Sequence, residues 1–181
     1  MISNPNTQSR QAPLPFLTTF IFAVALSGSC WAQSSAARTV VTFSDGASCS
    51  SPTGPPTFTA LSATVAGKTS FSATGGGGIG RISLDDAIIT RTVDNCSVSL
   101  FGLFFKTQRV RFVTISFETL VSGAYRQELK ITLSDVQISS ISDAGTGATI
   151  PQERLTLAYG KIAVFDPQTG QTSTYDVLLG R

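Results

Sequence analysis

Apolar and polar residues alternate with a period of two along several segments of this chain, most clearly in its second half. In residues 109–120, Val113, Ile115 and Phe117 alternate with threonine, serine and glutamate. Alternation of this kind places successive side chains on opposite faces of a β-strand and indicates that one face is buried. The same reasoning predicts further strands over residues 37–43, 58–65, 81–93, 128–141 and 154–165.

The apolar pattern changes face partway along three of these segments. The changes fall at the Asp85–Asp86 pair, at Asp135 and at Gly160. We expect a β-bulge at the acidic pair, because one extra residue moves the side chains that follow it to the other face. Strands that change their buried face midway are typical of a closed and strongly bent barrel. The pattern therefore predicts a mainly antiparallel β-barrel.

Other segments lack strand alternation. Residues 44–57 and 66–80 are rich in serine, proline and glycine, which is typical of loops. Residues 97–108 are compact and apolar, and their periodicity fits either a buried helix or a buried strand. Asp94, Asn95 and Ser97 can cap the start of a helix, and Lys106 suits its end. Three phenylalanines of this segment are expected in the core, with a partner-facing patch as the alternative: Phe101, Phe104 and Phe105.

The composition narrows the class of protein. The chain of 181 residues is long enough for one domain with a hydrophobic core. Its net charge is +2, without the clustered lysine and arginine that a nucleic-acid surface needs. Histidine is absent from the sequence, and this removes the commonest general base and the commonest metal ligand.

Three patterns that could carry chemistry have better structural explanations. Residues 75–80 match the glycine spacing of a dinucleotide-binding loop, but a strand rather than a helix is predicted after them. Asp85 and Asp86 are adjacent strand residues, so their side chains point to opposite faces and do not converge on a cation. Two of the three cysteines, Cys49 and Cys96, lie in the predicted domain, and two ligands are too few for a zinc site. We therefore expect no cofactor, no metal and no catalytic residues, and hence a protein that is not an enzyme.

The N-terminal region is predicted to be a secretory signal peptide. Phe16–Leu26 is an apolar run of about eleven residues, which is too short to span a bilayer core that needs about 20. Small residues follow at Cys30 and Ala32, as at a signal cleavage site. Cleavage after Ala32 would remove residues 1–32 and leave one domain, Gln33–Arg181, in the periplasm or outside the cell. An uncleaved anchor and lipidation of Cys30 are the alternatives.

Cleavage would leave two cysteines, Cys49 and Cys96. An even number of cysteines in an oxidising compartment favours a disulfide. A bridge within one chain would close a loop of about 47 residues and stabilise the fold by roughly 4 kcal/mol in the loop-entropy model. Two free thiols, or a bridge between chains, are the alternatives.

Several blocks of the sequence, taken in order, resemble the Hcp family, which builds the inner tube of bacterial type VI secretion systems. The first block is a glycine run that ends just before a basic residue. The second is a strand that begins with an acidic residue and contains a threonine followed by a basic residue. The third is the start of a helix, with a serine followed by a leucine. The likeness covers about residues 74–181 well and residues 37–73 loosely. The matching blocks are Gly78–Arg81, Asp86–Asp94 with Thr90-Arg91, Ser97–Leu100, 131–142 with Gly145 and Gly147, 153–170 with Glu153 and Lys161, and 174–181.

The resemblance implies an Hcp-like antiparallel β-barrel with one short α-helix at residues 97–108. It also implies a non-enzymatic structural protein whose six subunits join head-to-tail, by their sheet edges, into a hexameric ring. The lumen of such a ring can hold a small passenger protein. No nucleic acid and no stable membrane insertion after cleavage are expected.

The chain also departs from the family pattern. The second strand of the family carries a Leu-x-Trp-x-Trp pattern, whereas Leu61–Val65 contains no tryptophan. The loop after the first strand is neutral and proline-rich, and it holds Cys49. Hcp tube proteins are normally made without a signal peptide. These departures leave an alternative function: a monomeric secreted or periplasmic module for binding or adhesion on the same barrel.

Overall fold

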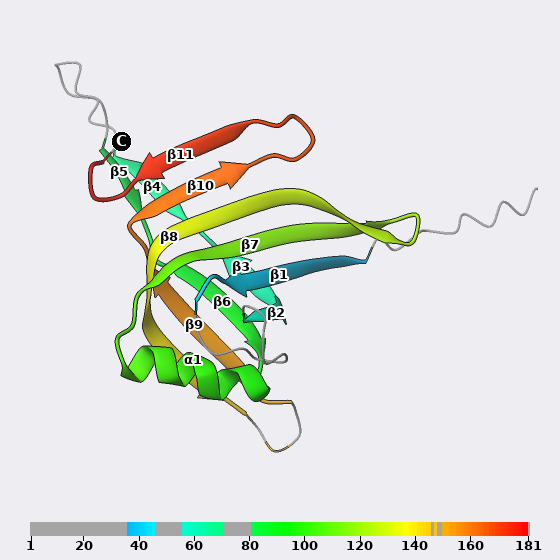
Figure 1. Cartoon of the computed structure of the whole chain (residues 1–181), viewed down its shortest axis with the longest axis vertical. Helices are drawn as coiled ribbons and strands as arrows, with labels where there is room; N and C mark the ends of the chain where they lie inside the picture. The colour runs from blue at the N-terminus through cyan, green and yellow to red at the C-terminus, as the bar shows by residue number, and fades with distance from the viewer. Residues whose placement is uncertain (1–35, 46–55, 71–80, 146, 148–149, 181) are drawn as a thin grey trace, which may run out of the picture. The chain divides into compact units, whose positions relative to one another are not determined.

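The computed structural model describes residues 36–45, 56–70, 81–145, 147 and 150–180. They belong to one compact unit, Ser34–Arg181. This unit is built mainly of antiparallel strands and contains one helix, as predicted (Figure 1). The predicted signal peptide, its cleavage site, Cys49 and residues 75–80 lie outside the described residues. The elements are β1 (Ala37–Phe43), β2 (Thr57–Ala60), β3 (Ser62–Thr64), β4 (Gly67–Ser70), β5 (Arg81–Leu84), β6 (Ala87–Thr92), α1 (Asn95–Phe105), β7 (Val110–Val121), β8 (Ala124–Ala144), β9 (Gln152–Ala158), β10 (Lys161–Phe165) and β11 (Thr172–Asp176).

Most strands follow one path of antiparallel neighbours, in the order β2, β1, β7, β8, β9, β6 and β3. The strands at the two ends of this path, β2 and β3, are consecutive in the chain and are separated only by Leu61. The Leu61 N–H donates to the Thr90 carbonyl oxygen of β6 at 2.8 Å. The chain therefore joins the two ends of the path, and the strands curve around one shared core (Figure 1). This arrangement agrees with the predicted barrel.

The long strand β8 changes its partners near Asp135. Its first half pairs with β7 and β10, and from Gln137 onward it pairs with β9. Asp135 has a φ of +55°, in the left-handed region that aspartate tolerates better than most residues. Leu133 and Val136 are both 0% exposed, so the inward-facing set of side chains shifts by one residue between them. The predicted change of face at Asp135 is confirmed.

Residues 154–165 form two strands rather than one, and the break falls at the predicted glycine. The Gly160 N–H donates to the Ser134 carbonyl oxygen, and the Gly160 carbonyl accepts from the Val177 N–H, each at 2.9 Å. On one side of Gly160, β9 pairs with β6 and β8. On the other side, β10 pairs with β8 and β11. Gly160 thus marks the point where the chain passes from one part of the sheet to another.

Gly160 also approaches Asp135 closely. A Cβ atom at Gly160 would lie 3.3 Å from the Asp135 Cβ. We expect Gly160→Ala to lower the free energy of unfolding by about 1–3 kcal/mol, the usual cost of overpacking. Gly102→Ala on α1 is the matched control: nothing lies within 4 Å of that position, and alanine favours a helix over glycine by about 0.5–1 kcal/mol. Urea denaturation of both variants checks the prediction, and effects of the same sign would contradict it.

The prediction of a loop over residues 66–80 is wrong in part. Gly67–Ser70 forms β4, which pairs with β5 in a two-stranded sheet of its own. Gly67, Lys68 and Thr69 are all exposed. The strand therefore carries no apolar alternation, the signal on which the sequence prediction relied.

The acidic pair Asp85–Asp86 separates two strands, so the prediction of a bulge within one strand is also wrong. Before the pair, β5 pairs with β4, and after it, β6 pairs with β3 and β9. The Asp85 N–H donates to the Ala66 carbonyl oxygen at 2.9 Å, and the Tyr159 hydroxyl donates to the Asp85 carbonyl oxygen at 3.0 Å. These bonds hold the backbone at the junction of the two sheets.

Residues 97–108, whose periodicity fitted either a helix or a strand, lie mostly in the helix α1. Asp94 is its N-cap and accepts from the Cys96 N–H at 2.7 Å, and Ser97 completes a capping box. The buried face is formed by positions three or four residues apart. Phe105 is 74% exposed, so its predicted place in the core is wrong, while Phe101 and Phe104 are partly buried. The buried residues of α1 are Cys96, Ser97, Leu100 and Leu103.

Candidate functional site

One edge of the sheet is not covered by another strand in the described part of the chain. This edge is β11, which pairs only with β10. Its sequence contains neither lysine nor proline, the residues that often protect an exposed edge. The Tyr175 hydroxyl donates to the Ile82 carbonyl oxygen at 3.2 Å and ties the strand to β5. The outer backbone groups of β11 are therefore placed to pair with a strand of another molecule.

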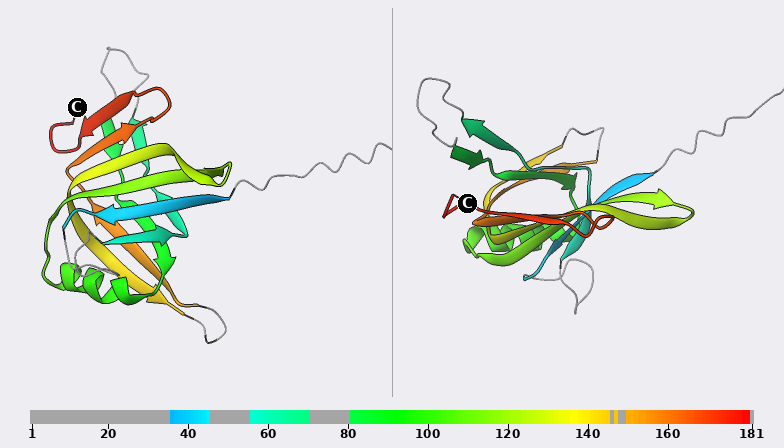
Figure 2. Two further views of the ribbon diagram at one scale, coloured as in Figure 1. Left: turned by 45° about the vertical axis from the view of Figure 1, so that its right-hand side comes forward. Right: turned by 90° about the horizontal axis from the view of Figure 1, so that it is seen from above.

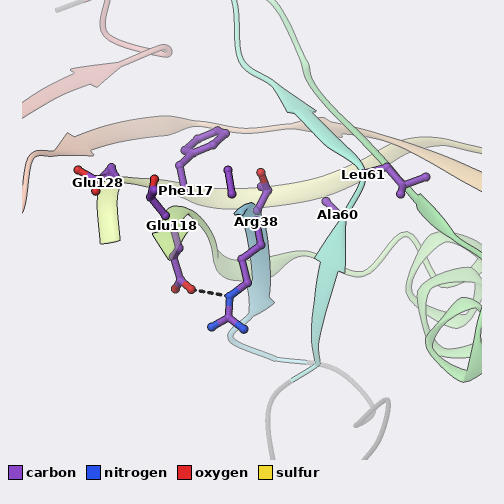
Figure 3. A pocket seen from close by; sticks show the side chains of 9 residues that line it. Arg38, Ala60, Leu61, Phe117, Glu118 and Glu128 are labelled. Carbon is purple, nitrogen blue, oxygen red and sulfur yellow. Dashed lines mark hydrogen bonds and ion pairs between the residues drawn. The ribbon is translucent and has the colours of Figure 1, made fainter. Parts of the chain in front are cut away.

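A second open edge lies where β1 begins (Figure 3). This strand pairs with β7 from Ala37 onward, but with β2 only from Thr39 onward. At Leu61 the chain turns away from β1, and β3 pairs with β6 instead. A groove of about 280 Å³ therefore lies between the start of β1, the facing part of β7 and the turn at Leu61. In Figure 2, β1 and the β7–β8 hairpin run side by side and project from the rest of the sheet.

Charged side chains beside this groove are paired. The Arg38 Nε donates to Glu118 Oε2 at 2.7 Å, and the Arg38 guanidinium carbon lies 3.6 Å from the centre of the Tyr125 ring. The Arg126 Nη2 donates to the Glu128 carboxylate at 2.8 Å. On the opposite wall Leu61 is 56% exposed. The groove therefore suits an uncharged, extended segment better than a highly charged ligand.

A buried cluster of charges lies where β6 and β9 meet the start of α1. Arg91 and Glu153 are directly opposite each other in the β6–β9 register, and they are 1% and 0% exposed. Arg91 Nη1 lies 3.5 Å from Glu153 Oε1, and Arg91 also forms an ion pair with Asp94. The Arg91 guanidinium carbon lies 4.2 Å from the centre of the Phe58 ring. One guanidinium thus contacts β2, β9 and the N-cap of α1.

The sequence analysis included Arg91 and Glu153 among the matching blocks but did not predict that they pair. Their pairing depends on the β6–β9 register, and the two residues lie far apart in the chain. A signal was nevertheless present. Each is a charged residue in a strand where buried positions alternate with more accessible ones. Each falls in phase with the buried positions of its strand, and buried charges are generally paired.

Burial raises the pKa of the Glu153 carboxyl above its ordinary value of 4.5. The Arg91 guanidinium and the Ser97 hydroxyl favour the charged carboxylate and oppose this rise in pKa. Asp143 and Asp94 add to the rise because they carry the same charge as the carboxylate. The net direction shows that desolvation outweighs the single guanidinium.

The remaining residues of interest are spread over the fold. Cys96 is 3% exposed at the start of α1, while Cys49 and the Ala32–Gln33 bond lie outside the described residues. Asp85 pairs with Lys68 at 3.7 Å, and Asp86 accepts from the Ser139 hydroxyl at 2.9 Å, so the two carboxylates have different partners.

Two further observations concern the described residues only. No three histidine, cysteine, aspartate or glutamate side chains gather there in an arrangement that could hold a metal ion. Within the same residues, no helix has both the length and the apolar character that a membrane-spanning helix needs.

Comparison with known proteins agrees with the geometry of the fold. A family model described as type VI secretion system effector, Hcp, matches residues 58–165, more than half of the chain. A search of curated proteins found no match.

Solved structures share the fold at low sequence identity. Hcp1 from Salmonella typhimurium has a TM-score of 0.62 and 18% identity, over 81% of this chain and 98% of that one. A mutant form of Hcp1 from E. coli EAEC 042 has a TM-score of 0.64 and 11% identity, over 78% and 99%. The secreted protein Hcp3 from Pseudomonas aeruginosa has a TM-score of 0.57 and 15% identity, over 78% and 98%. With the family match, these likenesses lead to one conclusion: the chain belongs to the Hcp family of type VI secretion system proteins.

Proposed function

We propose that this chain is a non-enzymatic structural subunit that joins its strand edges into a closed ring, hexameric as the family resemblance implies. The observation that carries the proposal is the presence of two different open edges, β11 and the start of β1 beside the groove. Two different edges allow a head-to-tail contact, and such contacts close into rings when the rotation permits. Closure would also cover edges that otherwise invite aggregation.

The direct test of the ring is the mass of the purified chain in solution, measured by light scattering after size exclusion. We expect a mass near six times that of one subunit, and particle images with a central hole. A mass near one subunit that stays unchanged at high protein concentration would contradict the ring. That outcome would favour the alternative, a monomeric binding or adhesion module, for which the groove with its exposed Leu61 offers a binding surface.

A variant of the β11 edge tests the contact itself. Ser173 is exposed on β11, and a lysine on an edge strand disfavours pairing with another chain. We expect Ser173→Lys to shift the mass toward one subunit. Ser140→Lys, at an exposed position of β8 that already pairs with β9, is the matched control and should leave the mass unchanged. If both variants keep six subunits, the contact through β11 is wrong.

We propose further that the chain is exported and that cleavage falls between Ala32 and Gln33. The support is the apolar run at Phe16–Leu26, followed by the small residues Cys30 and Ala32. Intact mass of the protein recovered from cells reports the cleavage, and a mass that retains residues 1–32 would contradict it. A ring in the periplasm or outside the cell could hold a small passenger protein in its lumen.

We also propose that Cys49 and Cys96 form a disulfide within one chain. The support is that these two cysteines would remain after cleavage and that Cys96 is 3% exposed at the start of α1. An oxidising compartment outside the cytoplasm would favour the bridge. Cys96 lies beside Asp94, so the bridge would tie the loop after β1 to the first turn of α1.

A further inference from the structure

The charges around Glu153 are not balanced. Glu153 lies on β9 between two strand partners. Arg91 of β6 is opposite it on one side, and Asp143 of β8 is opposite it on the other. Asp94, the N-cap of α1, pairs with the same Arg91. The groups that act on Glu153 from the packed elements are thus one guanidinium, two other carboxylates and the hydroxyl of Ser97.

The two central groups are also poorly solvated. Arg91 is 1% exposed and Glu153 is 0% exposed. The side-chain nitrogens of Arg91 and both carboxylate oxygens of Glu153 are buried without a hydrogen bond of standard geometry. Burying a charge costs free energy unless hydrogen bonds or a counter-charge compensate for it. Arg91 lies 3.5 Å from Glu153 and is shared with Asp94, whose side chain is 49% exposed to water. A proton on Glu153 would remove the charge of the one carboxylate in this cluster that water does not reach.

We propose that this cluster binds a proton on Glu153 and that the bound proton tightens the attachment of α1 to the sheet. The start of α1 is then held more firmly in mild acid and opens more readily as the pH rises. The proposal does not depend on ring formation, because every group in it belongs to one chain.

The direction of the effect follows from linkage. Burial holds the pKa of Glu153 above 4.5 in the closed structure. An opening that exposes Glu153 to water returns its pKa to that ordinary value, so the closed state binds the proton more tightly. The equilibrium constant for opening therefore increases with pH between 4.5 and the raised pKa, by up to about tenfold per pH unit.

Hydrogen exchange of the full chain tests the proposal, with mass-spectrometric readout and correction for the intrinsic effect of pH on exchange. We expect protection of α1 to fall as the pH rises across this window, and protection of β7 to stay constant. In Glu153→Gln, a neutral side chain of the same shape, protection of α1 should no longer depend on pH in this range. Equal pH dependence in the variant and the natural chain would overturn the proposal. Measurements at two protein concentrations separate this effect from assembly.

Titration of the Glu153 carboxyl carbon by NMR provides a second readout that does not need the variant to fold. A pKa above 4.5 is expected for the natural chain. A pKa below that value would show that the Arg91 ion pair outweighs desolvation, and the proposal would then be wrong. The side-chain carboxyl of Asp166 is the internal control: its pKa is lowered by hydrogen bonds from Thr169 and Gln168, so it should titrate on the acid side of the ordinary aspartate range.

Discussion

Replacing Arg91 with methionine is expected to lower the free energy of unfolding by about 3–5 kcal/mol at neutral pH, the range found when one partner of a buried ion pair is removed. Methionine fills a similar volume, so the fall in the free energy of unfolding would reflect removal of the charge rather than creation of a cavity. Arg91 is 1% exposed and is the guanidinium that pairs with Glu153 in the β6–β9 register. The variant also loses the contact with the Phe58 ring. Urea denaturation, followed by circular dichroism, measures the change.

The pH dependence and a double variant distinguish this explanation from a general packing defect. Without Arg91 the pKa of Glu153 should rise further, because the guanidinium favours the carboxylate. A raised pKa means that stability falls as the pH rises through it, so mild acid should restore part of the loss. Adding Glu153→Gln to Arg91→Met should restore much of it at neutral pH.

A matched control is available on the surface. Arg111 forms an ion pair with Asp45 at 2.9 Å, but its side chain is 76% exposed. Arg111→Met should therefore change stability much less than Arg91→Met. Two outcomes would show that the buried ion pair is not the cause of the lost stability. One is equal stability of Arg91→Met and Arg111→Met, and the other is no recovery of Arg91→Met stability in mild acid.

Loss of the proposed disulfide is expected to have an effect of similar size. Under oxidising conditions Cys49→Ser should lower the free energy of unfolding by roughly 4 kcal/mol, the loop-entropy value for about 47 enclosed residues. Cys49 is the better position for the substitution, because Cys96 is 3% exposed and a change there would also disturb the core. Chemical denaturation of the natural chain and the variant measures the difference.

The other cysteine and the redox state serve as controls. Cys30→Ser should not change stability, since residue 30 would be removed with the signal peptide. Reductant should destabilise the natural chain to the level of Cys49→Ser and leave that variant unchanged. A natural chain whose stability does not respond to reductant would contradict the bridge. A dimer that separates on reduction would show that the cysteines join two chains instead.

Sequence reasoning located most of the strands, because one face of each strand is buried and leaves a period of two. The predicted strand at residues 37–43 coincides with β1, and the buried face of β8 changes at Asp135 as the pattern indicated. The predicted break in the pattern at Gly160 marks the passage from β9 to β10. The same reasoning left residues 97–108 open between helix and strand, because a short apolar run carries no distinctive period.

Other features were decided only by contacts between distant parts of the chain. β4 is an exposed strand that exists because β5 pairs with it, so no local apolar signal revealed it. Phe105 was expected in the core, but the packed face of α1 is set by Leu100 and Leu103, which leaves Phe105 74% exposed. Local apolar content predicts that a segment is packed, but not which of its faces packs.

The sequence by itself determined the alternation of the strands, the positions where their buried faces change and the family to which the chain belongs. The tertiary structure decided which edges stay open and which charges meet. Arg91 and Glu153 become partners only through the β6–β9 register. Register depends on the hydrogen bonds and side-chain packing of whole strands. No short segment of sequence contains that information, so the strand edges and the buried ion pair appear only once the barrel is built.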